Sequence, residues 1–174
     1  MIAGGTGFVG SNLAIFLKKK FQDYHIICFD NLVRRGSELN VARLKDHNIE
    51  FFKGDIRRKK ELLSLQNIHV ILECSAEPSV LASYVDPVYT IDTNLFGTAH
   101  CLELARRDKS QVIFLSSSRV YPIEPINNIA FEELPTRFDW GRSIRGQGYS
   151  YEGIAVDFPL SGIRSLYGAS KIVL

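Results

Sequence analysis

Two residues near the end of the sequence have the types and spacing of an acid–base pair. Tyr167 and Lys171 lie four residues apart in the segment SLYGASK, and on a helix this spacing places both side chains on one face. An isolated phenol has a pKa of about 10 and is a poor base at neutral pH. An adjacent ammonium group lowers that pKa, so the pair can accept a proton from a sugar hydroxyl. Taken alone, the same pattern is more often a solvated helix face.

A glycine cluster opens the chain, with Gly4, Gly7 and Gly10 in the segment MIAGGTGFVG. The segment SNLAIFLKKK follows with helical spacing of its apolar residues and with cations at its end. A glycine turn between a short strand and a helix predicts a phosphate-binding site. In such a turn Gly4 makes the tight bend, Gly7 admits a pyrophosphate, and Gly10 lets the helix pack closely on the sheet. The alternative is a glycine-rich turn without a ligand.

An acidic residue, Asp30, ends the apolar segment HIICFD twenty residues after Gly10. A dinucleotide-binding fold places an acid there to accept hydrogen bonds from the adenosine ribose. Because a carboxylate repels a 2′-phosphate, Asp30 predicts NAD as cofactor rather than NADP. Arg34 and Arg35 follow closely and are suited to hold such a phosphate, so NADP is the weaker alternative. Asp30 as a simple turn or helix cap is the other interpretation.

Three consecutive serines, Ser116, Ser117 and Ser118, follow a predicted strand, where α/β folds place their ligand sites. A serine hydroxyl at this position can hydrogen-bond a reacting oxygen and orient it toward Tyr167. A polar turn between a strand and a loop is the alternative.

Short segments rich in β-branched and aromatic residues alternate with helical patterns along the chain. Their nearly continuous apolarity is typical of parallel strands covered on both faces. We expect an α/β fold of the Rossmann type, with a doubly wound parallel sheet, over residues 1–174. The first strand and the last helix are short, so the domain is expected to be truncated at both ends and this length alone is expected to be inactive as an enzyme. The predicted strands are 25–30, 49–53, 68–74 and 111–116, and the predicted helices are 37–46, 57–66 and 87–108.

Residues 122–166 have a different composition, with four prolines, five glycines and only short apolar stretches. Long ordered loops of this kind are typical of lids and binding loops. We therefore predict one long active-site loop before the helix that carries Tyr167.

The overall composition excludes several classes of protein. A net charge of +2, without a basic stripe that contains aromatic residues, argues against a nucleic-acid partner. No apolar run reaches the roughly 18 residues that span a bilayer, and no signal peptide is recognised, so a cytoplasmic protein without membrane contact is expected. Cys28, Cys74 and Cys101 are predicted to be buried free thiols. The four histidines share no metal-ligand spacing, so no metal site is expected.

Six motifs occur in order along the whole chain: AGGTGFVG, FDN, GDI, NLFGT, SSRVY and YGASK. Together they resemble the extended short-chain dehydrogenase/reductase superfamily of nucleotide-sugar epimerases and dehydratases. The resemblance implies a Rossmann domain, NAD as cofactor and a nucleotide-diphosphate sugar as substrate. It also implies that the complete protein is a homo-oligomer, and that its C-terminal substrate-binding region is absent from this chain. Ala3 replaces the usual threonine of the first motif.

The resemblance assigns roles to individual residues. Ser117, Tyr167 and Lys171 match the catalytic residues, with Ser116 and Ser118 as alternatives for the serine. Candidates for contact with the sugar are Glu77, Ser117 and Arg119. The alternative for Glu77 is a charged loop residue that binds no ligand. Asn94 matches an asparagine that mainly supports the geometry of the active site. The predicted cofactor-binding residues are Gly4, Gly7, Phe8, Val9, Gly10, Asp30, Asn31, Asp55, Ile56, Ser75, Ala76, Asn94, Tyr167 and Lys171.

One departure from the superfamily pattern narrows the reaction. Sugar 4,6-dehydratases have an Asp–Glu pair for water elimination where this chain has Ser118 and Arg119. This favours a redox epimerase or a simple dehydrogenase over a dehydratase.

Longer segments resemble a particular branch of the superfamily. FDNLVRRGSELNVARL, ECSAEPSVLASYVDP and the segment ending in YGASK are similar to the branch of the CDP-paratose 2-epimerases. The resemblance implies epimerisation at C2 of a CDP-dideoxyhexose. A UDP-sugar 4-epimerase, which shares the same catalytic residues, and a non-catalytic dinucleotide-binding module are the alternatives.

Overall fold

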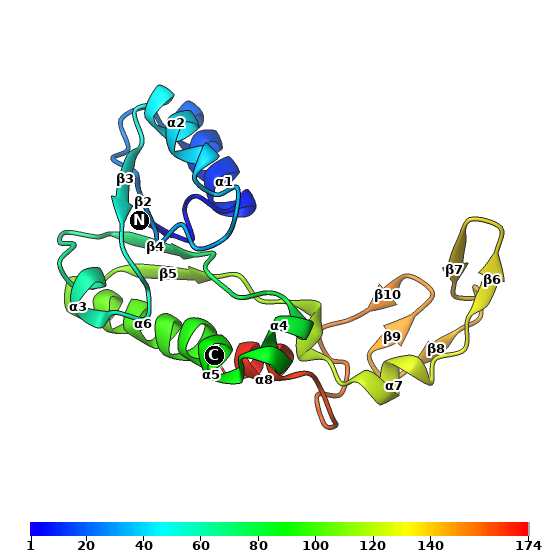
Figure 1. The fold of residues 1–174 in the computed structure, drawn as a ribbon. Helices are drawn as coiled ribbons and strands as arrows, with labels where there is room; N and C mark the ends of the chain where they lie inside the picture. Colours follow the sequence, from blue (N-terminus) through cyan, green and yellow to red (C-terminus); the bar gives the residue numbers. More distant parts are fainter. Residues whose placement is uncertain (174) are drawn as a thin grey trace.

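Five parallel strands form the central sheet of the computed structural model, which describes residues 1–173 (Figure 1). Their order is β3-β2-β1-β4-β5, so the chain winds outward on one side of β1 and then crosses to the other side. This order is that of a Rossmann-type doubly wound sheet, and the prediction of the fold class is confirmed. The strands are β1 Ile2–Ala3, β2 Ile27–Asp30, β3 Glu50–Lys53, β4 Val70–Glu73 and β5 Gln111–Phe114.

The short first strand, β1, is paired on both sides. Ile2 lies opposite Cys28 of β2 and Leu72 of β4, and Ala3 lies opposite Phe29 and Glu73. The switch in strand order therefore falls at β1, directly before the glycine turn. In open α/β sheets ligands bind at this point, outside the carboxyl ends of the strands.

Helices cover both faces of the sheet (Figure 1). Helices α1 Phe8–Lys20 and α2 Leu39–Asp46 pack with Cys28 in one apolar cluster through Ala14 and Leu44. Helices α3 Lys59–Leu62 and α6 Gly97–Asp108 pack with Phe29 in a second cluster. Cys28 and Phe29, which are neighbours in β2, thus point to opposite faces of the sheet, as the alternation of side chains along a strand requires.

The predicted helix over 87–108 is continuous but irregular. It consists of α5 Pro87–Ile91, a π-helical segment η1 Asp92–Phe96, and α6. Asp86 caps its start by accepting a hydrogen bond from the Tyr89 N–H at 2.8 Å. Single-turn π segments are frequent at functional sites, and this one carries the buried residue Asn94.

Two short helices bring functional loops into position. Helix α4 Val80–Val85 was not expected from the sequence, although Ser79 caps it through the Ala82 N–H at 3.1 Å. Helix α8 Leu166–Ile172 contains Tyr167 and Lys171, as predicted. Of the helix predicted over 57–66, only the single turn of α3 is formed.

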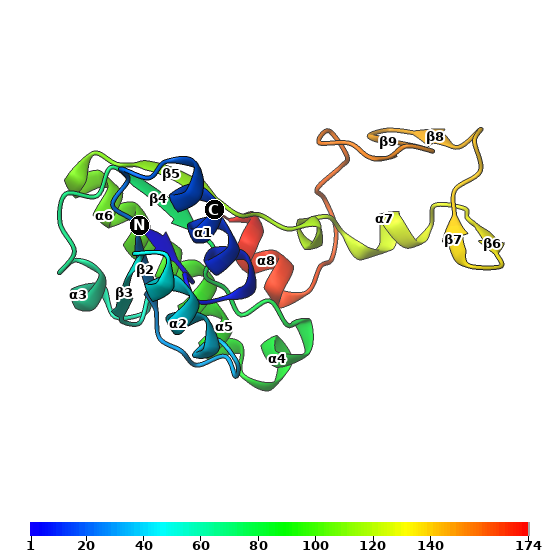
Figure 2. The same cartoon turned by 90° about the horizontal axis from the view of Figure 1, so that it is seen from above.

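The segment 122–166, which was predicted as one long active-site loop, has secondary structure of its own. It contains helix α7 Ile123–Asn127 and five strands in two small antiparallel sheets. Residues 123–163, the arm, project from the body of the molecule (Figure 2). Edge-on contacts among Trp140, Tyr149 and Phe158 stabilise it. The strands are β6 Glu132–Leu134, β7 Arg137–Asp139, β8 Arg145–Gly146, β9 Tyr149–Ser150 and β10 Gly153–Ile154.

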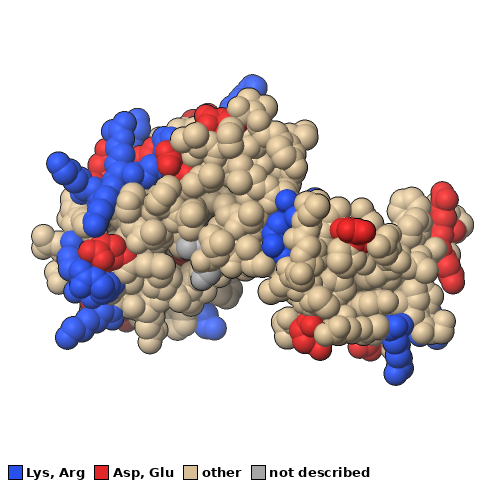
Figure 3. All heavy atoms as spheres, turned by 90° about the horizontal axis from the view of Figure 1, so that it is seen from below, with Lys and Arg blue, Asp and Glu red and all other residues tan. Residues whose placement is uncertain are grey.

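The remaining sequence expectations concern thiols, metals and charge. All three cysteines are free: Cys28 and Cys101 are buried and Cys74 is partly buried. Burial raises the pKa of Cys28 to about 12. Within residues 1–173 no three acidic, cysteine or histidine side chains gather as a metal site would require, and no helix is long and apolar enough to cross a bilayer. Basic and acidic side chains are intermixed on the face of the body shown in Figure 3.

Candidate active site

A cleft of about 720 Å³ opens at the carboxyl ends of the strands. Its lining includes the glycine turn with the start of α1, the end of β2, the loops that follow β2, β3, β4 and β5, one side of α5 and η1, and helix α8. The cleft thus brings together the two motifs that lie at opposite ends of the sequence, the glycine cluster and the Tyr167/Lys171 pair.

The glycine turn is shaped by contacts that exclude a side chain. Gly4 has φ +69°, and a Cβ there would lie 2.8 Å from the Cys74 carbonyl oxygen. A Cβ on Gly10 would overlap the Gly4 carbonyl oxygen, so Gly10 allows α1 to begin directly on the turn. Gly7 precedes α1 and lines the cleft. The N–H groups of the first helical turn have no partner within the helix, which suits them to a phosphate.

Asp30 lies at the end of β2 and faces the glycine turn. Its Oδ2 accepts from the Thr6 N–H at 3.1 Å, and its Oδ1 accepts from the Leu32 N–H at 2.9 Å. Each carboxylate oxygen keeps lone pairs for further donors, as binding of a ribose diol requires. Arg34 and Arg35 also line the cleft, so the structure places them near the same position.

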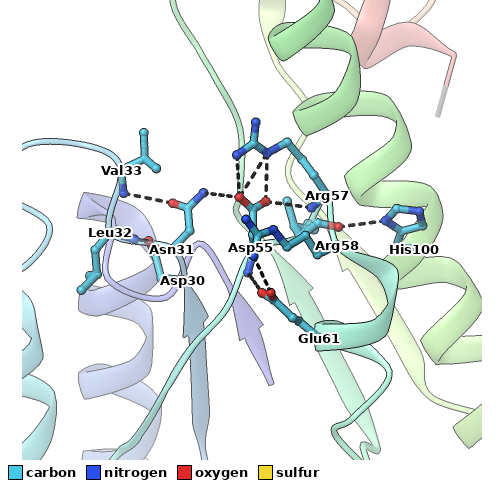
Figure 4. A network of polar contacts seen from close by, with 10 residues as sticks. Asp30, Asn31, Leu32, Val33, Asp55, Arg57, Arg58, Glu61 and His100 are labelled. Carbon is cyan, nitrogen blue, oxygen red and sulfur yellow. Dashed lines mark hydrogen bonds and ion pairs between the residues drawn. The ribbon is translucent and has the colours of Figure 1, made fainter.

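Asp55 is held in a polar network beside the cleft (Figure 4). Arg57 donates to both carboxylate oxygens, with a shortest distance of 2.6 Å, and Asn31 donates to Oδ2 at 3.2 Å. Burial opposes ionisation of Asp55, but these hydrogen bonds outweigh burial and lower its pKa to about 2. Asp55 does not line the cleft, whereas Asn31 and Ile56 do. The carboxylate therefore positions Asn31.

Tyr167 and Lys171 lie on the buried side of α8, where they are 8% and 4% exposed. Ser165 caps this helix by accepting from the Gly168 N–H at 3.1 Å. A Cβ on Gly168 would overlap the carbonyl oxygen of Arg119, so the helix lies directly against the turn that follows the serines. Both predicted catalytic side chains reach the cleft.

Lys171 forms a buried ion pair with Glu73. Its Nζ lies 3.8 Å from Glu73 Oε2 and 4.4 Å from the centre of the Phe114 ring. Burial lowers the pKa of Lys171, and the carboxylate of Glu73 acts in the opposite direction. The sequence analysis did not single out Glu73, although an acid inside the apolar segment IHVILEC was a signal for it.

Asn94 lies beneath the cleft and does not line it. Its Oδ1 accepts from the Glu77 N–H at 2.8 Å, and its Nδ2 donates to the Glu77 carbonyl at 3.2 Å. Glu77 itself lines the cleft and forms an ion pair with Arg34 at 3.2 Å. Asn94 thus holds the loop at Glu77 from below the cleft, and the roles that the resemblance assigns to it stay predictions.

The serines are arranged differently from the expectation. Ser116 lines the cleft, whereas the Ser117 Oγ accepts from the Arg119 N–H at 3.1 Å and caps the short 3₁₀ turn η2 Ser118–Val120. Ser117 and Arg119 do not line the cleft. The assignment of the catalytic serine to Ser117 stays a prediction, with Ser116 as the alternative that faces the cleft.

Most of the predicted cofactor residues come together in the cleft; among them only Asp55 and Asn94 lie outside its lining. Among the lining residues that sequence reasoning missed are Ser37, which precedes α2, and Tyr89 and Thr93, which lie on α5 and η1. Tyr89 also packs against the Arg57 guanidinium at 4.7 Å from the ring centre, which links the cleft to the Asp55 network.

Residues 1–143 match the NAD dependent epimerase/dehydratase family. The chain belongs to this family. CDP-paratose 2-epimerase from Salmonella typhi is 32% identical over 177 residues, which cover 98% of this chain and 49% of that protein. The dTDP-D-glucose 4,6-dehydratase of Dictyostelium discoideum is 32% identical over 70% of this chain and 29% of its own length. The chain thus spans at most about half the length of these family members.

Solved structures of the family have the same fold. The UDP-Glc/GlcNAc 4-epimerase of Campylobacter jejuni aligns over 98% of this chain and 45% of its own, with a TM-score of 0.73 and 22% identity. The dTDP-glucose 4,6-dehydratase of Streptomyces venezuelae, solved with NAD bound, aligns over 98% of this chain and 47% of its own, with a TM-score of 0.68 and 27% identity.

Proposed function

We propose that this chain is the NAD-binding part of a nucleotide-sugar epimerase that inverts C2 of CDP-paratose to give CDP-tyvelose through a 2-keto intermediate. One observation carries the proposal. Tyr167 and Lys171 lie together on the buried side of α8, at the same cleft as the glycine turn and Asp30. A proton acceptor is thereby combined with a dinucleotide site, as a redox epimerase requires.

The residues of the cleft fit NAD. Side chains at Gly4 and Gly10 would collide with the backbone, so the tight turn requires glycine at both positions, and Gly7, which lines the cleft, lets a pyrophosphate approach. The start of α1 offers free N–H groups to the phosphates, and Asp30 offers carboxylate oxygens to the adenosine ribose. Asn31, Ile56, Ser75 and Ala76 line the walls between these points. When bound, NAD supplies the hydride acceptor of the reaction.

In this proposal Tyr167 Oη accepts the proton of the C2 hydroxyl while hydride leaves the same carbon. Lys171 stabilises the tyrosinate through its charge. A serine hydroxyl from Ser117 or Ser116 orients the reacting oxygen. The 2-keto sugar then presents its opposite face, and Tyr167 returns the proton to the oxygen as hydride returns to carbon. Glu77 and Arg119 are proposed to contact the sugar.

The choice of C2 rests on the similarity to CDP-paratose 2-epimerase, which extends over 98% of this chain. A UDP-sugar 4-epimerase is the second candidate. It is supported by the Methanocaldococcus jannaschii protein described as a putative UDP-glucose 4-epimerase, which is 32% identical over 72% of this chain. We also propose that the protein is cytoplasmic, since free thiols suit a reducing compartment. We further propose that the complete protein is a homo-oligomer, as the family resemblance implies.

The decisive experiment is turnover in heavy water by the complete protein, which contains the substrate-binding region that the resemblance implies. If hydride leaves and returns within the site, the product CDP-tyvelose retains protium at C2, and no added NAD is consumed. Deuterium at C2 would indicate proton exchange with solvent and contradict the mechanism. A parallel assay with UDP-glucose separates the two candidates, because a 4-epimerase forms UDP-galactose. Tight NAD binding without turnover of either sugar would identify a binding module instead.

A further inference from the structure

Glu73 is a charged residue in the middle of the sheet. It is the last residue of β4, which pairs with β1 on one side and β5 on the other, and its side chain is fully buried. A carboxylate is costly to bury unless it is paired and hydrogen-bonded. The proposed reaction assigns no step to Glu73, so its position needs an explanation.

The carboxylate of Glu73 is surrounded by groups that favour its charged form. Ser75 donates to Oε1 through its backbone N–H at 2.9 Å and also through its hydroxyl. Oε2 faces the Lys171 ammonium at 3.8 Å. Burial is the larger influence and leaves the pKa of Glu73 above its ordinary value, although Lys171 and the hydrogen bonds from Ser75 act to lower it.

The charge of Lys171 depends on the same ion pair with Glu73. Its ammonium is 4% exposed and has the Phe114 ring on one side. Cys74 is the other titratable group close to it, and burial raises the pKa of that thiol to about 11, so the thiol is neutral at physiological pH. The other elements packed against α8 carry Arg119, Tyr84, Tyr89, Asp86 and Asp92, and within residues 1–173 none of these forms an ion pair with Lys171.

We propose that Glu73 is a positioning residue that keeps Lys171 charged and holds its ammonium group at the cleft, one helical turn from Tyr167. This role rests on the proposed function, in which the charge of Lys171 turns Tyr167 into a base. Without the carboxylate, burial would favour the neutral amine. A neutral amine stabilises the tyrosinate less, so Tyr167 would accept protons less readily.

The first test measures the titration of Lys171 in the cofactor-free chain by NMR of labelled lysine, with the signal assigned by its loss in Lys171→Arg. Glu73→Gln removes the charge and keeps the shape, and we expect it to lower the pKa of Lys171 by about one unit or more. Glu73→Asp restores the charge and should recover most of that loss. Glu103→Gln, which removes an exposed acid paired with Arg106, is the matched control and should change nothing.

An unchanged pKa of Lys171 in folded Glu73→Gln would overturn the proposal. If Glu73→Gln does not fold, the reciprocal measurement decides: in Lys171→Met the pKa of the Glu73 carboxyl rises if the two charges are coupled, and an unchanged value refutes the coupling. In the active protein, the acidic limb of the pH–rate profile should move to higher pH in Glu73→Gln, which a purely structural role would not cause. NAD binding by the unmodified chain is measured in a separate titration. Absence of NAD binding would contradict the proposed function, whereas the pKa measurements alone decide whether Glu73 and Lys171 are coupled.

Discussion

The Nδ2 of Asn94 donates to the Oγ of Ser170 at 3.0 Å, and both side chains are buried. This bond joins the π-helical segment η1 to the helix of Tyr167 and Lys171. Because the same amide also binds the backbone of Glu77, three segments around the cleft share one hydrogen-bonding side chain.

Asn94→Ala should therefore destabilise the protein. The change removes the hydrogen bonds to the partly buried backbone of Glu77 and one of the two bonds of the buried Ser170 hydroxyl, which keeps its bond to the Tyr167 carbonyl, at an expected cost of about 1–3 kcal/mol in the free energy of unfolding. Urea denaturation measures this difference. The control is Asn12→Ala, which removes an exposed amide on α1 bonded to the Phe8 carbonyl and should cost less than about 0.5 kcal/mol. Equal costs for the two variants would contradict the role of Asn94.

The glycines of the turn should respond differently to alanine. Gly10→Ala forces a Cβ against the Gly4 carbonyl and should lower stability by about 1–3 kcal/mol. Gly7 has φ −66°, which alanine adopts freely, and its Cβ would lie 3.2 Å from the same oxygen. Gly7→Ala should therefore remain nearly as stable as the unmodified chain but bind NAD at least about tenfold more weakly, a loss of about 1.4 kcal/mol. Thermal unfolding and calorimetric titration separate the two effects; normal NAD affinity in Gly7→Ala would place the pyrophosphate elsewhere.

Replacement of Asp30 tests the choice of cofactor. Asp30→Ala should weaken NAD binding by about 1–3 kcal/mol, the range for hydrogen bonds to a charged group. Asp30→Asn is the matched variant, because it keeps an oxygen for the Thr6 or Leu32 N–H while the charge is lost. NADP should bind the unmodified chain far more weakly than NAD in calorimetric titrations. Equal or tighter binding of NADP would instead point to Arg34 or Arg35.

The Tyr167→Phe variant tests the assignment of the base. It should keep NAD binding and lose at least about 10²–10⁴-fold in turnover, because the ring packing is retained while the proton acceptor is removed. Steady-state rates with CDP-paratose and cofactor titration measure the two properties. A turnover close to that of the unmodified enzyme would show that another group accepts the proton.

The Asp55 network predicts a defined acid sensitivity. The pKa of Asp55 in the folded chain is about 2, below the value of about 3.9 for a free aspartate. The stabilisation from its charge is therefore complete above about pH 4 and is lost as the pH falls toward 2. It amounts to about 2 kcal/mol. Asp55→Asn should be less stable by this amount at pH 7, and the difference should shrink near pH 2. A difference independent of pH in urea denaturation would contradict this account.

The predicted strands and the position of Asp30 follow from patterns that are local in the sequence. The segments 25–30, 49–53, 68–74 and 111–116 each contain an observed strand. Burial on both faces accounts for the apolarity of β2, whereas β3 and β5 lie at the edges of the sheet and are only partly buried. The glycine turn was likewise predictable, since its contacts exclude a Cβ whatever the rest of the chain does.

The features that could not be predicted depend on tertiary contacts. The strands of the arm have two or three residues each, too few to produce an alternating pattern. Helix α4 has six residues, packs against α5 and α8, and leaves Leu81, Tyr84 and Val85 exposed, so its sequence does not show the apolar face of a buried helix. The pairing of Glu73 with Lys171 joins residues 98 positions apart (171 − 73), and nothing in either motif specifies it.

The arm leaves the body and returns to it at almost the same point. The Ile123 N–H donates to the Ile163 carbonyl at 2.9 Å, and the Arg164 Nε donates to the Val120 carbonyl at 2.9 Å, so both ends of the excursion are fastened together. Because these hydrogen bonds fix the two ends of the arm, the length and composition of the residues between them can change while the ends keep their positions. The fold can therefore acquire a new recognition surface here without any change to the strands that hold Glu73, Asp30 and the glycine turn.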